Sequence, residues 1–90
     1  MPDLPILYIK NGCPWCEEAL AYFVKHGVAL NVKDVRVDGQ AMEHLVSASG
    51  QTRTPTLHWG DFVVADFSVG EFEDALEKTP GMREKLGMGG

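Results

Sequence analysis

The chain has 90 residues, of which 44% are hydrophobic, 23% charged and 9% aromatic, the balance of an ordinary globular protein. We expect one domain spanning residues 1–90, with a thin core, because a chain of this size buries only about 60–70% of its unfolded surface. The formal net charge of −5 argues against nucleic acid or an anionic membrane as the main partner, since both repel surplus carboxylates.

The first apolar run, residues 6–9, is too short for the core of a signal peptide or for a membrane span. We therefore expect a cytoplasmic location. The β-branched and aromatic content of this run predicts a buried strand, which ends at the turn Asn11-Gly12. A helix then begins at Pro14, where proline loses no hydrogen bond, and ends at Gly27. Its buried face is predicted to hold Cys16, Leu20, Phe23 and Val24.

The middle of the chain predicts a second strand and a second helix. Residues 29–37 alternate apolar with polar side chains, with a slip at Lys33-Asp34 that leaves the register open. After Asp38-Gly39 the apolar spacing changes to three and four, which predicts a helix ending at Gly50. The side chains expected on its inner face are Met42, Leu45, Val46 and Ser49.

The last third of the chain predicts a hairpin and a capped helix. The runs 56–59 and 62–65 flank the two-residue loop Gly60-Asp61, which is typical of antiparallel strands. Ser68 can cap the following helix, because Glu71 stands three residues later as a capping box requires. The inner face of this helix is predicted to hold Val69, Phe72, Ala75 and Leu76.

Pro80-Gly81 ends that helix, and residues 82–86 can add one more turn. The predicted order is strand, helix, strand, helix, strand, strand, helix. A β-α-β opening requires a right-handed crossover with parallel strands, whereas the hairpin adds an antiparallel pair. The sequence therefore predicts an α/β fold in which a mixed four-stranded sheet is flanked by three or four helices (β-α-β-α-β-β-α).

The two cysteines, Cys13 and Cys16, indicate redox or metal chemistry, because two are too few for a secreted disulfide framework. At i and i+3 on a helix start, their Cα atoms can lie roughly 5–6 Å apart, as a disulfide needs. Cys13 would lie at the positive end of the helix dipole, which lowers the pKa of its thiol. Cys16, one turn deeper, is shielded and placed to resolve a mixed disulfide. We predict Cys13 as the nucleophile and Cys16 as the resolving cysteine.

A zinc half-site is the alternative for this cysteine pair. Tetrahedral zinc needs four ligands, and the remaining candidates, His26, His44 and His58, are not spaced as a second ligand pair. We therefore expect no metal site.

Residues 10–16, Lys-Asn-Gly-Cys-Pro-Trp-Cys, resemble the glutaredoxin signature, in which a basic residue stands three before the first cysteine and an aromatic residue lies between the two. Residues 49–55 resemble the segment that carries the cis-proline of the thioredoxin fold. The resemblance covers essentially residues 5–78. It implies a thioredoxin fold and a thiol–disulfide oxidoreductase that reduces protein disulfides or glutathione mixed disulfides.

The resemblance also implies a groove beside Cys13 for the cysteine part of glutathione or of a peptide. The Thr54–Pro55 bond would be cis and would present the backbone of Thr54 to the substrate. Lys10 would contact a carboxylate of glutathione, and Trp15 would form a wall of the groove. The two further positions expected to contact glutathione are Gln51 and Ser68.

Some of these residues also have a plain structural explanation. Lys10 is also typical of a solvated strand end, Trp15 of a surface aromatic, and Ser68 of a helix cap. Glutaredoxins usually carry a Gly-Gly pair and then an aspartate that hold the γ-glutamyl end of glutathione, and here the matching residues are Ala65-Asp66-Phe67-Ser68. If Asp66 faced the groove, it would repel a glutathione carboxylate.

The expected partners are disulfide-containing proteins and glutathione, which would act as reductant, and we expect no tightly bound cofactor. We also expect a monomer. Two alternatives stay open. One is a redoxin that is recharged by a thioredoxin-reductase-like flavoenzyme. The other is a dimer that holds an iron–sulfur cluster with Cys13 of each chain and two external thiols.

Overall fold

The computed structural model describes residues 4–88. Within them the chain forms four strands and four helices: β1 (Ile6–Ile9), α1 (Pro14–Lys25), β2 (Asn31–Asp34), α2 (Gly39–Ser49), β3 (Thr56–Trp59), β4 (Phe62–Val64), α3 (Val69–Glu77) and α4 (Met82–Leu86). The strands form one sheet in the order β2-β1-β3-β4. Strand β1 pairs parallel with β2 and antiparallel with β3, and β3 pairs antiparallel with β4. The predicted mixed sheet is confirmed.

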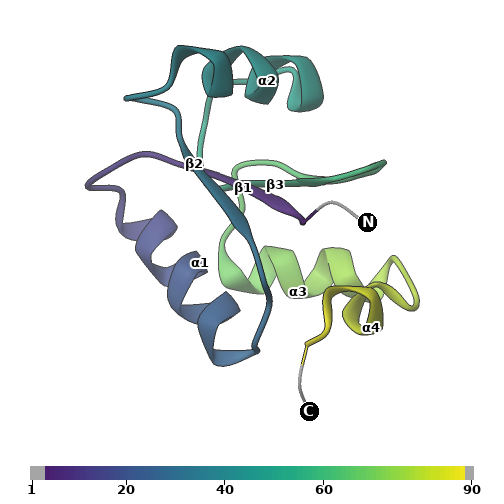
Figure 1. Cartoon of the computed structure of the whole chain (residues 1–90). Helices are drawn as coiled ribbons and strands as arrows, with labels where there is room; N and C mark the ends of the chain where they lie inside the picture. The colour runs from purple at the N-terminus through teal and green to yellow at the C-terminus, as the bar shows by residue number, and fades with distance from the viewer. Residues whose placement is uncertain (1–3, 89–90) are drawn as a thin grey trace.

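The sheet separates two apolar layers, because successive side chains of a strand point to opposite faces. Leu7 packs with Phe23 of α1 and Phe72 of α3 in one cluster. Tyr8 packs on the other face with Leu45 of α2. Figure 1 shows α2 alone above the sheet, with α1, α3 and α4 below it. None of the helices within residues 4–88 is both long and apolar enough to cross a membrane.

The helix starts follow local sequence rules. Asp38 caps α2, because its carboxylate accepts the N–H groups of Gln40 at 3.1 Å and Ala41 at 3.2 Å. Ser68 and Glu71 form the predicted capping box at the start of α3, with bonds of 3.2 and 2.9 Å. These bonds satisfy backbone donors that the first turn of a helix leaves unpaired.

The second strand and the buried face of α1 differ from the prediction. The second strand covers only Asn31–Asp34, because Asp34 turns the chain: its carboxylate accepts the N–H of Arg36 at 2.9 Å. Val24 is not on the buried face of α1, since 79% of it is exposed. It lies eight residues after Cys16, so its side chain is rotated by about 80° from that of Cys16 around the helix axis. The side chain buried there instead is Ala19.

The inner faces of the other two helices are narrower than predicted. On α2 the buried residues are Ala41 and Leu45, whereas Val46 is 42% exposed. On α3 the buried residues are Phe72 and Leu76. A helix of nine to eleven residues packed on one side buries only the positions nearest the contact.

Candidate active site

The turn between β1 and α1 places Cys13 at the start of the helix. Gly12 has a φ of +83°, a backbone conformation that glycine adopts without a steric penalty. The N–H of Cys13 donates to the carbonyl of Lys10 at 3.2 Å, which closes the turn. Cys13 is the N-cap of α1 and Pro14 follows in the first turn, as predicted.

The two thiols lie in different environments. Cys13 is partly exposed, whereas Cys16 is 2% exposed, and the two are not joined in a disulfide. The Sγ of Cys13 accepts the backbone N–H of Cys16 at 3.3 Å. The accessible sulfur of Cys13 therefore lies at the helix start, next to the shielded Cys16.

The pKa values of the two thiols move apart. Burial raises the pKa of the Cys13 thiol, but hydrogen bonds to its sulfur from the Cys16 thiol, the Cys16 N–H and the Thr54 hydroxyl outweigh burial and lower it overall. Burial raises the pKa of Cys16, and its hydrogen bond with Cys13 raises it further. Cys13 is therefore the better nucleophile at neutral pH, because the thiolate is the reactive form.

Thr54 and Pro55 lie beside the cysteines although they follow them by about forty positions. The Thr54–Pro55 peptide bond is cis, in agreement with the expectation from the resemblance. The hydroxyl of Thr54 lies 4.0 Å from the Sγ of Cys13, and both Thr54 and Pro55 are buried. The loop before β3 thus supplies one side of the site.

Gln51 holds this loop in place from within. Its amide nitrogen donates to the hydroxyls of Ser49 at 2.8 Å and Thr56 at 3.1 Å. Its amide oxygen accepts the N–H of Arg53 at 2.6 Å. The side chain predicted to contact glutathione is therefore already bonded to neighbours in the loop, which orients the residues that follow it.

A hollow of about 330 Å³ adjoins Trp15 and is also lined by Asp66, Phe67, Ser68 and Glu71. Trp15 therefore forms one wall of this hollow, and its predicted contact with glutathione stays a prediction. The hydroxyl and N–H of Ser68 are engaged in the capping box with Glu71. Ser68 therefore acts as a helix cap while lying at the rim of the hollow.

Asp66 faces the hollow, but a cation partly neutralises its charge. Its carboxylate lies 3.4 Å from the guanidinium of Arg53, and its φ of +51° places it in the left-handed region. Arg53 was not among the residues predicted from the sequence. A signal was present, because this arginine directly precedes Thr54 and Pro55.

The family model for glutaredoxin matches residues 6–64, which include both cysteines and Pro55. The chain belongs to the glutaredoxin family. It is similar in structure to a glutaredoxin of Archaeoglobus fulgidus, with a TM-score of 0.71 and 21% identity over 84% of this chain and 87% of that one. It is also similar to a glutaredoxin of Brucella melitensis, with a TM-score of 0.65 and 24% identity over 94% and 89% of the two chains.

A protein described as thioredoxin-like gives a TM-score of 0.71 and 26% identity, and the match covers 80% of this chain and 99% of that one. A search of the curated proteins found no match. The structural similarities confirm the predicted thioredoxin-like fold.

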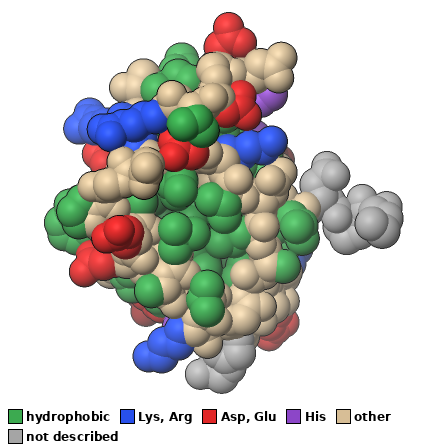
Figure 2. Space-filling view, turned by 60° about the vertical axis from the view of Figure 1, so that its left-hand side comes forward, with side chains coloured by type: hydrophobic (Ala, Val, Ile, Leu, Met, Phe, Trp, Pro, Cys, Tyr) green, Lys and Arg blue, Asp and Glu red, His purple; other side chains and the backbone are tan. Residues whose placement is uncertain are grey.

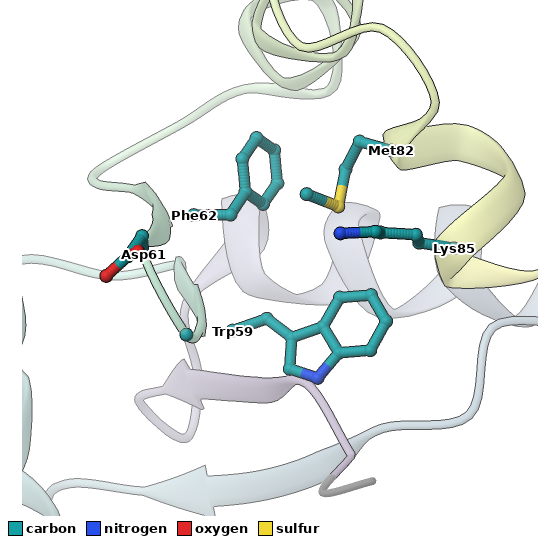
Figure 3. Close-up of a pocket in the computed structure, with 6 residues that line it drawn as sticks. Trp59, Asp61, Phe62, Met82 and Lys85 are labelled. Atoms are coloured by element: carbon teal, nitrogen blue, oxygen red, sulfur yellow. The ribbon is translucent and has the colours of Figure 1, made fainter.

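A second hollow, of about 550 Å³, lies far from the cysteines and is lined by Trp59, Gly60, Asp61, Phe62, Met82 and Lys85 (Figure 3). Ile6 at the start of β1 pairs with His58, so Trp59 lies beyond that end of the strand, whereas Cys13 follows the other end. A strand of four residues spans about 10 Å. This hollow is therefore too remote to take part in disulfide exchange.

The histidines considered as zinc ligands do not assemble with the cysteines. Within residues 4–88, no group of three or more His, Cys, Asp or Glu side chains is arranged to hold a metal ion.

Alkylation should separate the two thiols of the reduced protein. At pH 7, a slow alkylating reagent should label Cys13 at least about tenfold faster than Cys16, because Cys13 is exposed and has the lower pKa. The pH profile for Cys13 should have its midpoint at a lower pH than the profile for Cys16, because the pKa of the Cys13 thiol is lowered and that of Cys16 is raised. Mass spectrometry of the labelled peptides measures both rates. Equal labelling of the two cysteines would contradict these roles.

Proposed function

We propose that the chain is a thiol–disulfide oxidoreductase that reduces protein disulfides or glutathione mixed disulfides. The observation that carries this proposal is the accessible Sγ of Cys13, held at the start of α1 by the Cys16 N–H and 4.0 Å from the Thr54 hydroxyl. Membership of the glutaredoxin family supports the same class of reaction.

The proposed cycle has two exchange steps. The Cys13 thiolate attacks one sulfur of the substrate disulfide, a Cys13–substrate disulfide forms, and the other substrate sulfur leaves and takes up a proton. Cys16 then loses its proton and attacks the Cys13 sulfur, which releases the second substrate thiol and leaves a Cys13–Cys16 disulfide. Two electrons pass from the dithiol to the substrate.

An external reductant must return two electrons and two protons to the Cys13–Cys16 disulfide. Two molecules of glutathione can supply them, and the thiol of the first would attack at Cys13. Trp15 and the hollow beside it would receive the rest of the glutathione molecule. Lys10 and Arg53, which pairs with Asp66, would supply cations for its carboxylates. A thioredoxin-reductase-like flavoenzyme is the alternative donor, and both routes suit a reducing compartment such as the cytoplasm.

A pair of coupled assays tests the proposal. NADPH consumption is followed with a protein disulfide as substrate, once with glutathione and glutathione reductase and once with thioredoxin reductase. We expect turnover with at least one donor system, and the faster system identifies the reductant. If neither system consumes NADPH above the rate without the protein, and the reduced protein also fails to reduce the disulfide stoichiometrically, the proposed activity is wrong.

Removal of the Asp66 charge should improve the use of glutathione. Asp66→Asn keeps the shape and tolerates the left-handed backbone, while it frees Arg53 and removes a repulsive carboxylate from the hollow. Because both groups are partly exposed, we expect the Michaelis constant for glutathione to fall only about two- to fivefold.

The matched control for this experiment is Asp61→Asn, which removes the same charge at the remote hairpin turn and should leave glutathione kinetics as they are. An unchanged Michaelis constant in Asp66→Asn would show that glutathione does not approach this carboxylate.

A further inference from the structure

Trp15 stands out of the surface next to the nucleophile, and 58% of it is exposed. It lines two hollows at once. One, of about 330 Å³, lies toward Phe67 and α3. The other, of about 540 Å³, lies along α1 and is lined by Pro14, Glu17, Glu18 and Ala21 as well. Such an exposed aromatic between hollows is typical of a binding surface rather than of a plain solvated face.

We call the residues of these two hollows the Trp15 surface. Its apolar part is formed by Pro14, Trp15, Ala21 and Phe67, and its polar part by Ser68 and the carboxylates of Glu17, Glu18, Asp66 and Glu71. Figure 2 brings forward the side where the loop between β1 and α1 lies and shows hydrophobic side chains over the middle of that face, with charged ones mostly around its border.

The charged side chains that line the Trp15 surface are all carboxylates. The four carboxylates come from both sides of Trp15, and no Lys, Arg or His is among the described residues that line the two hollows. Arg53 offsets only Asp66, through their 3.4 Å ion pair. The carboxylate of Glu71 accepts one backbone N–H, from Ser68. A ligand that covers Trp15 therefore meets a negative rim.

We propose that the Trp15 surface selects protein disulfides whose cysteine is flanked by lysine or arginine, with an apolar side chain that packs on the indole. This inference rests on the proposed function and names the class of substrate for the same site. Opposite charges on the two surfaces speed the encounter and orient the partner. Contact with Trp15 would bring the substrate sulfur to Cys13, which directly precedes the helix turn that carries the indole.

The test compares two peptides that carry the same intramolecular disulfide and the same apolar neighbour, one with lysines and one with glutamates beside the cysteines. The ratio of their kcat/KM values cancels any change in the intrinsic reactivity of Cys13. We expect a preference of about tenfold for the lysine peptide at low salt, since each exposed charge pair changes binding by roughly two- to fivefold. The preference should shrink toward one at about 0.5 M salt, where screening is strong.

Two variants locate the effect. The double variant Glu17→Gln/Glu18→Gln should reduce the preference about threefold. The matched control Asp61→Asn/Glu77→Gln removes two exposed carboxylates outside the Trp15 surface and should leave the preference as it is. A third variant, Glu71→Gln, keeps the capping hydrogen bond, because glutamine also serves in a capping box, and should lower the preference by a similar factor per charge.

Each outcome is decisive. If neither peptide is reduced although the coupled assays show reduction of a protein disulfide, the proposed selectivity is refuted and the proposed function stands. If the coupled assays fail as well, the proposed function itself fails. If both are reduced equally fast, the chain is an oxidoreductase without the proposed selectivity. If the control pair lowers the preference as much as the Glu17 and Glu18 pair, only the net charge matters and the local surface is refuted.

Discussion

Replacement of Cys13 by serine should abolish disulfide reduction and lower kcat/KM by a factor on the order of 10³ or more, as expected for the loss of a nucleophile. A serine hydroxyl does not ionise near neutral pH and forms no disulfide, so the first exchange step has no substitute. Cys16 cannot take over this step, because it is 2% exposed and burial raises the pKa of its thiol. The coupled NADPH assay measures the loss.

The fold should survive this change. Serine is among the preferred N-cap residues, and its Oγ can accept the Cys16 N–H that the Cys13 sulfur now accepts. Thermal unfolding should therefore show a melting temperature equal to or above that of the reduced wild type. Cys16→Ser is the matched variant: it should still form a mixed disulfide through Cys13 but fail to release a protein substrate. Substantial activity in Cys13→Ser would contradict the assigned roles.

The largest loss of stability should follow from Phe72→Ala. Phe72 is fully buried and contacts the rings of Tyr22, Phe23, Phe62 and Phe67, with centroid separations of 5.0 to 6.2 Å. A Phe→Ala change in a packed core lowers the free energy of unfolding by about 3–5 kcal/mol, against a total of about 5–15 kcal/mol for a small domain. We expect a large drop in the midpoint of urea unfolding.

Val24→Ala provides the control, because Val24 is 79% exposed and its truncation should change the free energy of unfolding by less than about 0.5 kcal/mol. Both variants are measured by urea unfolding of the reduced protein. A loss for Phe72→Ala below about 1 kcal/mol would mean that the aromatic cluster does not form as described.

The order and type of the helices and strands could be predicted from the sequence, because local rules decide them. Pro14 starts α1, the Ser68 and Glu71 pair starts α3, and Gly60-Asp61 turns the hairpin. The Cys13 and Cys16 spacing likewise placed one thiol at the helix cap and the other on its inner face. Each of these predictions depends on residues within about four positions of one another, where backbone geometry leaves few choices.

The end of the second strand and the exposure of single helix side chains were harder to predict. Val24 and Val46 are apolar and were placed on the buried faces of their helices by helical spacing. Yet Val24 is 79% exposed and Val46 is 42% exposed. Spacing alone tells which residues share a helix face, but the width of the buried stripe depends on how closely the sheet approaches that face. The second strand was predicted too long for a related reason: the Asp34 side chain bonds to the Arg36 N–H, and that bond competes with continued sheet pairing.

The sequence by itself determined the fold class and placed the cysteine pair at the start of α1, since both follow from short-range patterns. The same patterns predict the division of roles between the two thiols. Only the tertiary structure decided that Thr54 lies 4.0 Å from the Cys13 sulfur, that Arg53 pairs with Asp66 and that Trp15 lies between two acidic hollows. These contacts join segments that lie apart in the sequence and that the folded sheet and helices bring together. The distances across these contacts depend on how α1 and α3 pack against β1 and β3, and short-range sequence patterns do not predict that packing.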